Sequence, residues 1–237
     1  MPRELLVGVD EAGRGPVVGD MVVSLAAIPR ELEDLLREAG VRDSKLLEKA
    51  ERRRAYEASL AAGAFIVLVY APPWLIDEEN LNSIEEECAK KALTVASRVL
   101  KKLGPAAVRV YIDEVKGRAE KLADYAKKAF SYAQTSVVVE PNADAKYVAT
   151  SLASIAAKVS RDASIEPLKK LFGDLGSGYP SDPETRQWIQ RIYNHLQEPP
   201  PFIRASWSTL RDLAPRWYRA GKGRRRGARS LLDYVKR

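Results

Sequence analysis

The stretch that decides the fold is residues 5–16, which read Leu5-Leu6-Val7-Gly8-Val9-Asp10-Glu11-Ala12-Gly13-Arg14-Gly15-Pro16. Its first half is a short apolar run, which is typical of a buried β-strand. The run ends directly in two acids, and the glycines and proline that follow are residues that favour a turn. We therefore expect a strand whose carboxyl end carries Asp10 and Glu11 into a loop.

Working outward, apolar runs of strand length alternate along the chain with longer amphipathic segments. Further strands are expected over 17–28 (one or two, with Gly19 inside), 64–70, 107–113 and 135–140. Helices are expected over 31–39, 46–62, 84–103, 118–132, 148–172 and 184–198. The run 64–70 is continuously apolar, so we expect that strand to be buried on both faces. The alternation of strands with helices predicts an α/β fold, in which helices cover a sheet.

The composition is that of a folded protein outside the membrane. Of the 237 residues, 46% are hydrophobic and 30% are charged, which argues against a membrane protein and against wholesale disorder. No apolar run approaches the roughly 20 residues that span a bilayer. The N-terminal apolar run is too short for a signal peptide and meets acids where a cleavage site would follow. We expect a cytoplasmic protein with no membrane contact.

The sequence holds few soft metal ligands. Cys88 is its one cysteine and His195 its one histidine, so neither a disulfide nor a cysteine-rich zinc site can form within the chain. A metal in this protein must therefore be held by oxygen atoms. Oxygen ligands favour Mg²⁺ or Mn²⁺ over zinc.

The positive charge gathers at the C-terminal end. The formal net charge is +7, and residues 216–237 contain nine Lys or Arg and one acid, which leaves residues 1–215 near −1. The sequence therefore divides into a nearly neutral body, 1–215, and a basic tail, 216–237. Such a tail indicates a polyanionic partner. A solvated tail without a binding role remains the alternative.

A second expected strand, 107–113, also ends in an acid, Asp113. Ligands bind at strand ends in open α/β sheets. If this strand lies beside 5–10, three carboxylates converge and repel one another unless a cation is bound. Adjacent side chains of a strand point to opposite faces, so Asp10 and Glu11 can share one metal only if the chain turns there. Acids at strand ends also serve as helix caps or loop solubilisers, and both interpretations stay open.

Six motifs in order resemble those of the ribonuclease H type 2 (HII) family, and of its archaeal branch in particular. They are GVDEAGRGP (8–16), DSK (43–45), YID (111–113), ADAKY (143–147), SLASIAAKVSRD (151–162) and GSGYPSD (176–182). The resemblance spans about residues 5–210. It implies a ribonuclease H-like mixed β-sheet flanked by helices, with a C-terminal helical extension.

The resemblance also implies a set of metal-binding acids, namely Asp10, Glu11, Asp113 and Asp144. From the residues alone, Asp144 would be assigned to the N-terminus of the expected helix 148–172, where a carboxylate complements the helix dipole. Its role as a ligand therefore follows from the resemblance only.

Further positions match the family's substrate-binding segments. Gly13, Arg14 and Gly15 match the segment that recognises the ribose 2′-hydroxyl at the RNA–DNA junction, and Tyr179 matches the aromatic that stacks on the following deoxyribose. Ser151 and Lys158 share the polar face of the helix 148–172, which is expected to face nucleic acid or support the acids. Lys45 is a candidate phosphate contact. Packing for Tyr179 and plain solvation for the helix face are the alternatives.

The activity that the resemblance implies is that of a monomeric, metal-dependent endonuclease. It would hydrolyse the RNA strand of RNA–DNA hybrids and cut on the 5′ side of ribonucleotides embedded in duplex DNA, leaving 3′-hydroxyl and 5′-phosphate ends. Two Mg²⁺ or Mn²⁺ ions roughly 3.5–4 Å apart would activate water and stabilise the leaving oxygen. One alternative is a nucleic-acid-binding module whose acids are structural. Another is ribonuclease H type 3, but a first strand at about residue 5 leaves no room for its added N-terminal domain, and Arg14 fits type 2 better.

The end of the tail suggests a protein partner. Residues 228–235, ARSLLDYV, loosely resemble the motif by which DNA-processing enzymes dock on a replication sliding clamp. Glutamine is expected where Ala228 stands, and Val235 replaces a second aromatic. The alternative is an amphipathic C-terminal segment without a partner.

Overall fold

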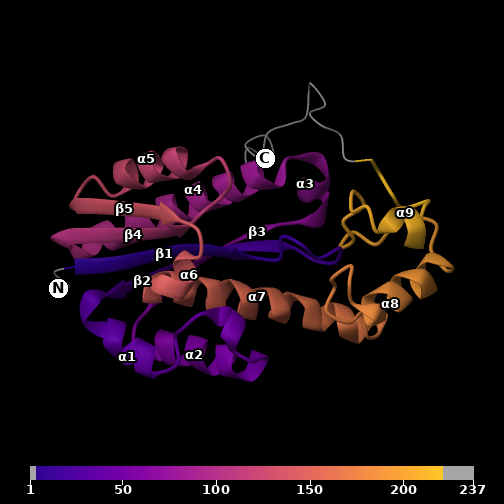
Figure 1. Cartoon of the computed structure of the whole chain (residues 1–237), viewed down its shortest axis with the longest axis horizontal. Helices are drawn as coiled ribbons and strands as arrows, with labels where there is room; N and C mark the ends of the chain where they lie inside the picture. The colour runs from indigo at the N-terminus through magenta and orange to yellow at the C-terminus, as the bar shows by residue number, and fades with distance from the viewer. Residues whose placement is uncertain (1–3, 221–237) are drawn as a thin grey trace.

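The computed structural model describes residues 4–220 of the chain (Figure 1). At its centre, the described residues form a five-stranded sheet in the order β3-β2-β1-β4-β5. Its strands are β1 (Glu4–Ala12), β2 (Met21–Pro29), β3 (Phe65–Ala71), β4 (Ala107–Asp113) and β5 (Gln134–Glu140). β2 runs antiparallel to both β1 and β3, whereas β4 is parallel to β1 and to β5. The expected mixed sheet is therefore confirmed.

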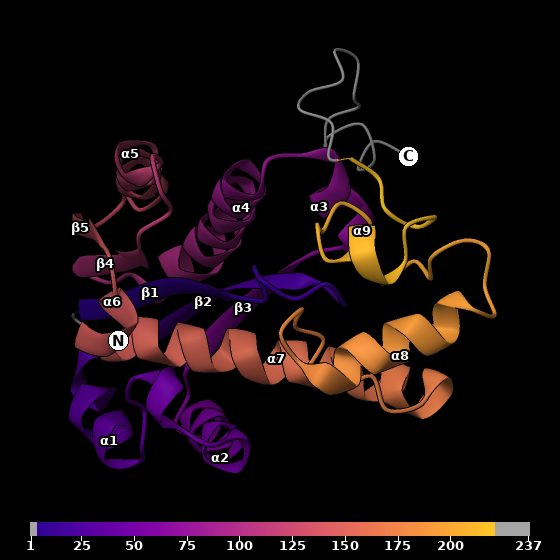
Figure 2. The ribbon, with the colours of Figure 1, turned by 45° about the vertical axis from the view of Figure 1, so that its right-hand side comes forward.

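Helices cover both faces of the sheet (Figures 1 and 2). One face carries α3 (Pro73–Glu78), α4 (Leu81–Leu100) and α5 (Ala119–Ala129). The other carries α1 (Glu33–Glu38), α2 (Lys49–Ala61) and the long α7 (Val148–Phe172). The short α6 (Ala143–Lys146) links β5 to α7, and α8 (Pro183–Tyr193) and α9 (Leu210–Leu213) form the C-terminal helical extension. This is the flanked sheet with an extension that the sequence predicted.

The alternation of side chains along β1 distributes its residues between two cores. Leu5, Val7 and Val9 pack into the core on the α4 side, and Leu6 packs into the core under α7. Gly8 shares the α7 side, and a Cβ atom there would lie 2.1 Å from the carbonyl carbon of Ala149. Only glycine therefore lets the backbone of α7 approach the sheet this closely. The same alternation turns Asp10 toward α7.

Two helix boundaries follow local rules that the sequence had already indicated. The predicted helix 148–172 is α7, with the same bounds. The stop signal after the expected helix 84–103 is also confirmed, because α4 continues as a 3-10 turn to Leu103 and ends where Gly104 adopts a left-handed φ of 60°.

One expectation was wrong, and two short helices were not predicted. The strand 64–70 was expected to be buried on both faces, but β3 is an edge strand that pairs only with β2, so most of its side chains are half-buried and Tyr70 is exposed. β3 ends at Ala71, and Pro73 then occupies the first turn of α3, where a missing N–H costs nothing; this helix was not predicted. The short α6 was not predicted either.

The C-terminal extension has its own apolar cluster. Trp188, Leu210 and Trp217 are fully buried in it together with Val17 and Val18. The amide of Arg219 donates to the carbonyl oxygen of Ala205 at 2.9 Å. Packed structure thus continues beyond residue 215, where the basic tail was expected to begin. Residues 221–237, including the segment 228–235, lie outside the described residues. No helix within 4–220 is long and apolar enough to cross a membrane.

Candidate metal centre and substrate cleft

Three carboxylates meet where β1 and β4 end. The pairing of these parallel strands stops at Val9 and Ile112, and Asp10 and Asp113 are the next residues on each strand. One carboxylate oxygen each from Asp10, Glu11 and Asp113 lies within 4.8 Å of the other two. The expectation that these strands are neighbours is therefore confirmed.

The chain does not turn between Asp10 and Glu11, so the expected need for a turn was wrong. β1 continues to Ala12, and Glu11 pairs with Val23 of β2. β1 has no pairing with β4 beyond Val9, and this leaves space beside the strand. The side chains of adjacent residues can both reach that space from opposite faces.

The cluster carries negative charge that the nearby Lys45 ammonium offsets only from a distance. Within 4–220, none of its three carboxylates makes an ion pair. Asp10 is buried, and burial, followed by the charge of Glu11, raises its pKa well above the usual range. The pKa of Asp113 is also raised, mainly by burial, although the Ala143 amide donates to its carboxylate at 2.8 Å and opposes the shift. A cation bound by oxygen ligands would relieve this repulsion, so the donor set fits a divalent metal ion.

Asp144 lies beside this cluster but in a separate pair. It is buried on α6, and its carboxylate forms an ion pair with the Lys45 ammonium at 3.1 Å. The negative charge of Asp144 contributes to the raised pKa of Asp113, so the two carboxylates interact. The structure thus brings Asp144 near the three acids without placing it among them.

The polar face of α7 is occupied by a buried network. Ser154 and Ser44 are fully buried with their hydroxyl oxygens 2.8 Å apart. The Lys158 ammonium donates to both hydroxyls, at 2.8 and 2.6 Å. Ser154 also forms a hydrogen bond with Asp10 that lowers the pKa of that acid. The Ser151 hydroxyl instead donates to the backbone carbonyls of Asp144 and Tyr147, which makes it a support for α6 rather than part of the cleft wall.

A cleft of about 570 Å³ opens next to the carboxylates. Its wall includes the predicted substrate residues Gly13, Arg14, Gly15, Lys158 and Tyr179, together with Glu11 of the cluster. It also includes cations that sequence reasoning missed, namely Lys49, Arg52, Arg161 and Lys169. Lys45 and Ser151 do not line it.

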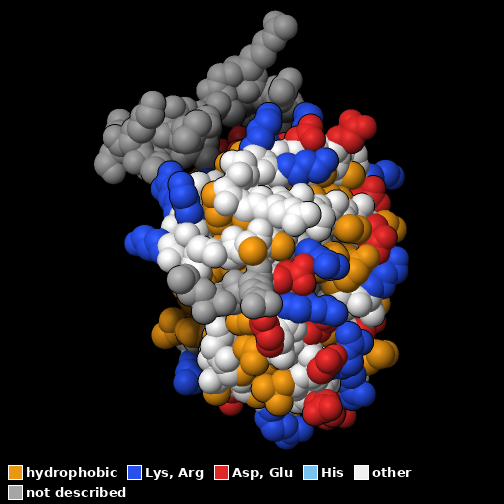
Figure 3. Space-filling model, turned by 90° about the vertical axis from the view of Figure 1, so that its left-hand side faces the viewer, with side chains coloured by type: hydrophobic (Ala, Val, Ile, Leu, Met, Phe, Trp, Pro, Cys, Tyr) orange, Lys and Arg blue, Asp and Glu red, His pale blue; other side chains and the backbone are white. Residues whose placement is uncertain are grey.

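Six cationic and three acidic residues line this cleft, Arg14 among the cations. By contrast, the face shown in Figure 3 mixes Lys and Arg with Asp and Glu among hydrophobic side chains. Some cleft cations are paired, for example Lys49 with Glu166 at 2.7 Å. The excess of positive charge beside a carboxylate cluster suits a polyanion that also binds a divalent ion.

Tyr179 stands over a buried arginine at the edge of the cleft. The Arg161 guanidinium lies 5.4 Å from the centre of the tyrosine ring and donates to the carbonyl oxygen of Ser177 at 3.2 Å. A Cβ atom on Gly15 would meet the same ring at 3.3 Å. Tyr179 is nevertheless 41% exposed. An aromatic ring with one supported face and one open face can stack on a substrate group.

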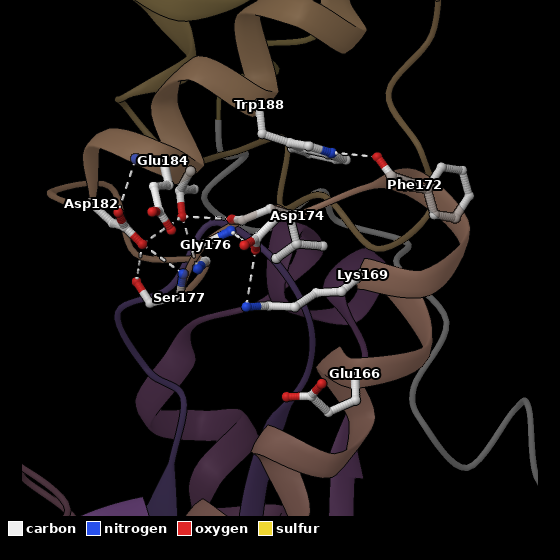
Figure 4. A network of polar contacts seen from close by, with 12 residues as sticks. Glu166, Lys169, Phe172, Asp174, Gly176, Ser177, Asp182, Glu184 and Trp188 are labelled. Atoms are coloured by element: carbon white, nitrogen blue, oxygen red, sulfur yellow. Dashed lines mark hydrogen bonds and ion pairs between the residues drawn. The ribbon is translucent and has the colours of Figure 1, made fainter.

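The loop that carries Tyr179 is fixed by Asp182, at the start of α8 (Figure 4). One oxygen of its carboxylate accepts bonds from both the amide and the hydroxyl of Ser177 at 2.6 Å, and the other accepts from the Glu184 amide at 3.0 Å. Chiefly through the Ser177 hydroxyl, these bonds lower the pKa of Asp182 to about 2. Lys169 pairs with Asp174 at 3.1 Å in the same network.

The loop 13–15 presents backbone rather than side chains to the cleft. The Arg14 side chain is held by α4, since it forms an ion pair with Glu85 and donates to Asn82 at 2.7 Å. The backbone carbonyls of the loop accept bonds from Arg204 and Trp207, which lie about 190 residues away in sequence. Sequence reasoning missed both residues, because no pattern in the extension links them to the loop.

Comparisons with known proteins agree with one another. The family model described as Ribonuclease HII matches residues 7–210. The Ribonuclease HII of Hyperthermus butylicus is 43% identical over 233 residues, which cover 97% of this chain and 94% of the relative. The crystal structure of ribonuclease H2 from Pyrococcus horikoshii OT3 is similar with a TM-score of 0.75 and 35% identity, over 90% of this chain and 98% of that one. The structure of the PCNA:RNase HII complex from Archaeoglobus fulgidus gives 0.71 and 32%, over 96% and 99%.

Proposed function

The chain belongs to the ribonuclease HII family of enzymes acting on RNA–DNA hybrids, and from this premise we propose that it also cuts on the 5′ side of single ribonucleotides embedded in duplex DNA. The observation that carries the proposal is the carboxylate cluster beside a cleft lined mainly by cations. The cluster suits the scissile phosphate with its metal ions, and the cleft suits the flanking strand.

Asp10, Glu11 and Asp113 would hold the divalent ions, either Mg²⁺ or Mn²⁺. Asp144 would join them once its Lys45 partner, an exposed side chain, turns toward a substrate phosphate. When bound, two such ions lower the pKa of the attacking water and stabilise the charge on the leaving 3′-oxygen. This chemistry leaves 3′-hydroxyl and 5′-phosphate ends and needs no side-chain nucleophile.

The chain's other residues would bind and orient the substrate. The loop 13–15 would recognise the ribose 2′-hydroxyl, which is the group that separates RNA from DNA. Tyr179 would stack its open face on the next deoxyribose, and Asp182 would hold its loop in place. Lys158 and the cations of α2 and α7 that line the cleft would contact phosphates without reading base sequence.

Three duplexes of one base sequence test this function: all-DNA, DNA with one ribonucleotide, and an RNA–DNA hybrid. With Mg²⁺ or Mn²⁺, the single-ribonucleotide duplex should be cut once, on the 5′ side of the ribonucleotide, and the hybrid along its RNA strand. The all-DNA duplex should remain intact. Cleavage of the hybrid alone would overturn the embedded-ribonucleotide part of the proposal.

Deleting residues 221–237 should weaken substrate binding and flatten its salt dependence. The cut is placed there because Trp217 is buried in the apolar cluster of the C-terminal extension and has to be kept. Each phosphate contact that is lost should reduce the slope of log K against log salt by about 0.9 for duplex DNA. Fluorescence anisotropy at several salt concentrations measures the slope, and an unchanged slope would show that the tail does not touch the substrate.

The segment 228–235 is proposed to dock on the sliding clamp, and the Archaeoglobus fulgidus relative, solved in complex with PCNA, supports this. Tyr234→Ala should abolish the retention of the full chain on immobilised cognate clamp. Lys236→Ala, a change in the same tail outside the motif, should leave retention unchanged. Equal retention of all three proteins, or of none, would contradict docking through this segment.

A further inference from the structure

Arg204 is buried and forms no direct ion pair among residues 4–220, although the charges of Asp20 and Asp77 act on it from farther away. Its guanidinium donates three hydrogen bonds to backbone carbonyl oxygens, those of Gly13 at 2.7 Å, Arg14 at 3.1 Å and Gly19 at 2.9 Å. Burying a guanidinium is costly unless its hydrogen bonds are satisfied. The guanidinium satisfies its donors on the backbone of the segment 13–19.

The direction of these bonds determines which way the backbone amides of the loop point. The carbonyl of Gly13 belongs to the same peptide group as the amide of Arg14, and the carbonyl of Arg14 to the same group as the amide of Gly15. In a trans peptide the oxygen and the hydrogen point to opposite sides. The amides of Arg14 and Gly15 consequently point away from Arg204.

The cleft lies on that opposite side. All three residues of the loop 13–15 line it, and Arg204 does not. Neither the Arg14 amide nor the Gly15 amide donates to another residue in the described part of the chain. Two backbone donors are thus presented together at the cleft wall, next to Glu11 of the carboxylate cluster.

Further contacts keep this arrangement in place. The Trp207 indole donates to the carbonyl oxygen of Gly15 at 2.8 Å, and the Arg204 guanidinium lies 4.9 Å from the centre of the indole ring. The Arg204 amide donates to the carbonyl oxygen of Val17 at 2.9 Å. A cation bound to a carbonyl oxygen also polarises the peptide group, which strengthens its N–H as a donor.

We propose that Arg204 is a positioning residue for ribose recognition, which holds the amides of Arg14 and Gly15 so that they donate to the 2′-hydroxyl oxygen of the substrate. This inference rests on the proposed function. A deoxyribose offers no oxygen at that place, so the benefit of the aligned donors is confined to ribonucleotides.

Arg204→Gln tests the inference in the full-length enzyme. Its kcat/KM on the single-ribonucleotide duplex should fall roughly 10–100-fold, the equivalent of one or two hydrogen bonds at about 1.4 kcal/mol per factor of ten. The inhibition constant of the all-DNA duplex as a competitor should stay unchanged, because no 2′-hydroxyl is involved. Arg204→Lys, which keeps the charge but not the fork of donors, should fall in between.

Arg211→Gln is the matched control. Arg211 is an exposed arginine of the same extension, whose guanidinium bonds the Tyr218 hydroxyl at 2.8 Å, and its replacement should move neither constant. If Arg204→Gln lowers kcat/KM and also weakens the binding of the all-DNA competitor, the inference is overturned in favour of a general structural role. An equal loss of kcat/KM in Arg211→Gln would overturn it in the same way. If Arg204→Gln does not fold, the same two constants are measured for Arg204→Lys and Trp207→Phe, and the same outcomes decide.

The two proposals fail differently. An unmodified enzyme that does not cut the single-ribonucleotide duplex contradicts the proposed function. An unmodified enzyme that cuts it, together with an Arg204→Gln variant that cuts it equally well, contradicts the positioning role alone.

Discussion

Asp113→Asn should leave the fold intact and abolish cleavage of ribonucleotide-containing duplexes in Mg²⁺. The asparagine carbonyl oxygen can still accept the bond from the Ala143 amide, which is 2.8 Å long in the unmodified protein. It cannot supply the negative charge that a divalent ion requires from this cluster. The loss in kcat should exceed the roughly 10–100-fold that removing a supporting partner of a metal ligand costs.

The same substitution should not lower stability when divalent ions are absent. The folded-state pKa of Asp113 lies above its ordinary value of 3.8, mainly through burial, so ionisation disfavours the folded state. That penalty is absent below about pH 3.8 and is complete above the folded-state pKa. At pH 7 with EDTA, the Tm of Asp113→Asn should therefore equal or exceed that of the unmodified protein.

Asp124→Asn is the matched control, since Asp124 is exposed on α5, away from the cluster. It should retain full activity. Full activity of Asp113→Asn under the same conditions would contradict the assignment of Asp113 as a metal ligand.

Gly8→Ala should destabilise the fold strongly. The added Cβ would lie 2.1 Å from the Ala149 carbonyl carbon and 2.2 Å from the Thr150 nitrogen. These are backbone atoms of α7, which cannot rotate away as a side chain would. Overpacking of a core costs typically about 1–3 kcal/mol, and a contact with backbone should reach or exceed the upper end of that range.

Chemical denaturation of Gly8→Ala against Gly40→Ala isolates the effect of this contact. A Cβ atom at Gly40 meets nothing within 4 Å, and its cost comes only from a φ of 93°, which should amount to about 1–2 kcal/mol. Gly8 has no positive φ, so any loss of stability there comes from crowding. A smaller loss in Gly8→Ala than in Gly40→Ala would contradict the close packing of α7 on β1.

The parts of the fold that were predictable are those encoded locally. The strand at Leu5, the strand ending at Asp113 and the helix 148–172 each carry their own apolar pattern and stop signal, and the structure places them as expected. The order of strands in the sheet is not encoded locally. The apolar run 64–70 looks like a central strand, but β3 is the edge, because its position depends on which partner β2 leaves free.

The candidate site also has one part that the sequence predicts locally and one part that it does not. Asp10, Glu11 and Asp113 could be grouped from strand ends alone, and the structure brings their oxygens together. Arg204 could not be linked to the loop at Gly13, because the contact joins residues 191 positions apart and involves only backbone atoms of the loop. Every residue type has a backbone carbonyl that can accept a hydrogen bond, so the residue types of the loop do not indicate this contact.

The most direct test of the metal centre is anomalous scattering from crystals of the enzyme soaked in Mn²⁺. A peak should appear among the carboxylate oxygens of Asp10, Glu11 and Asp113, at roughly the 2.0–2.2 Å that hard divalent ions keep from oxygen ligands. The peak should be lost in Asp113→Asn or strongly weakened. A strong Mn²⁺ peak elsewhere in the cleft, with none at these three carboxylates, would contradict the account.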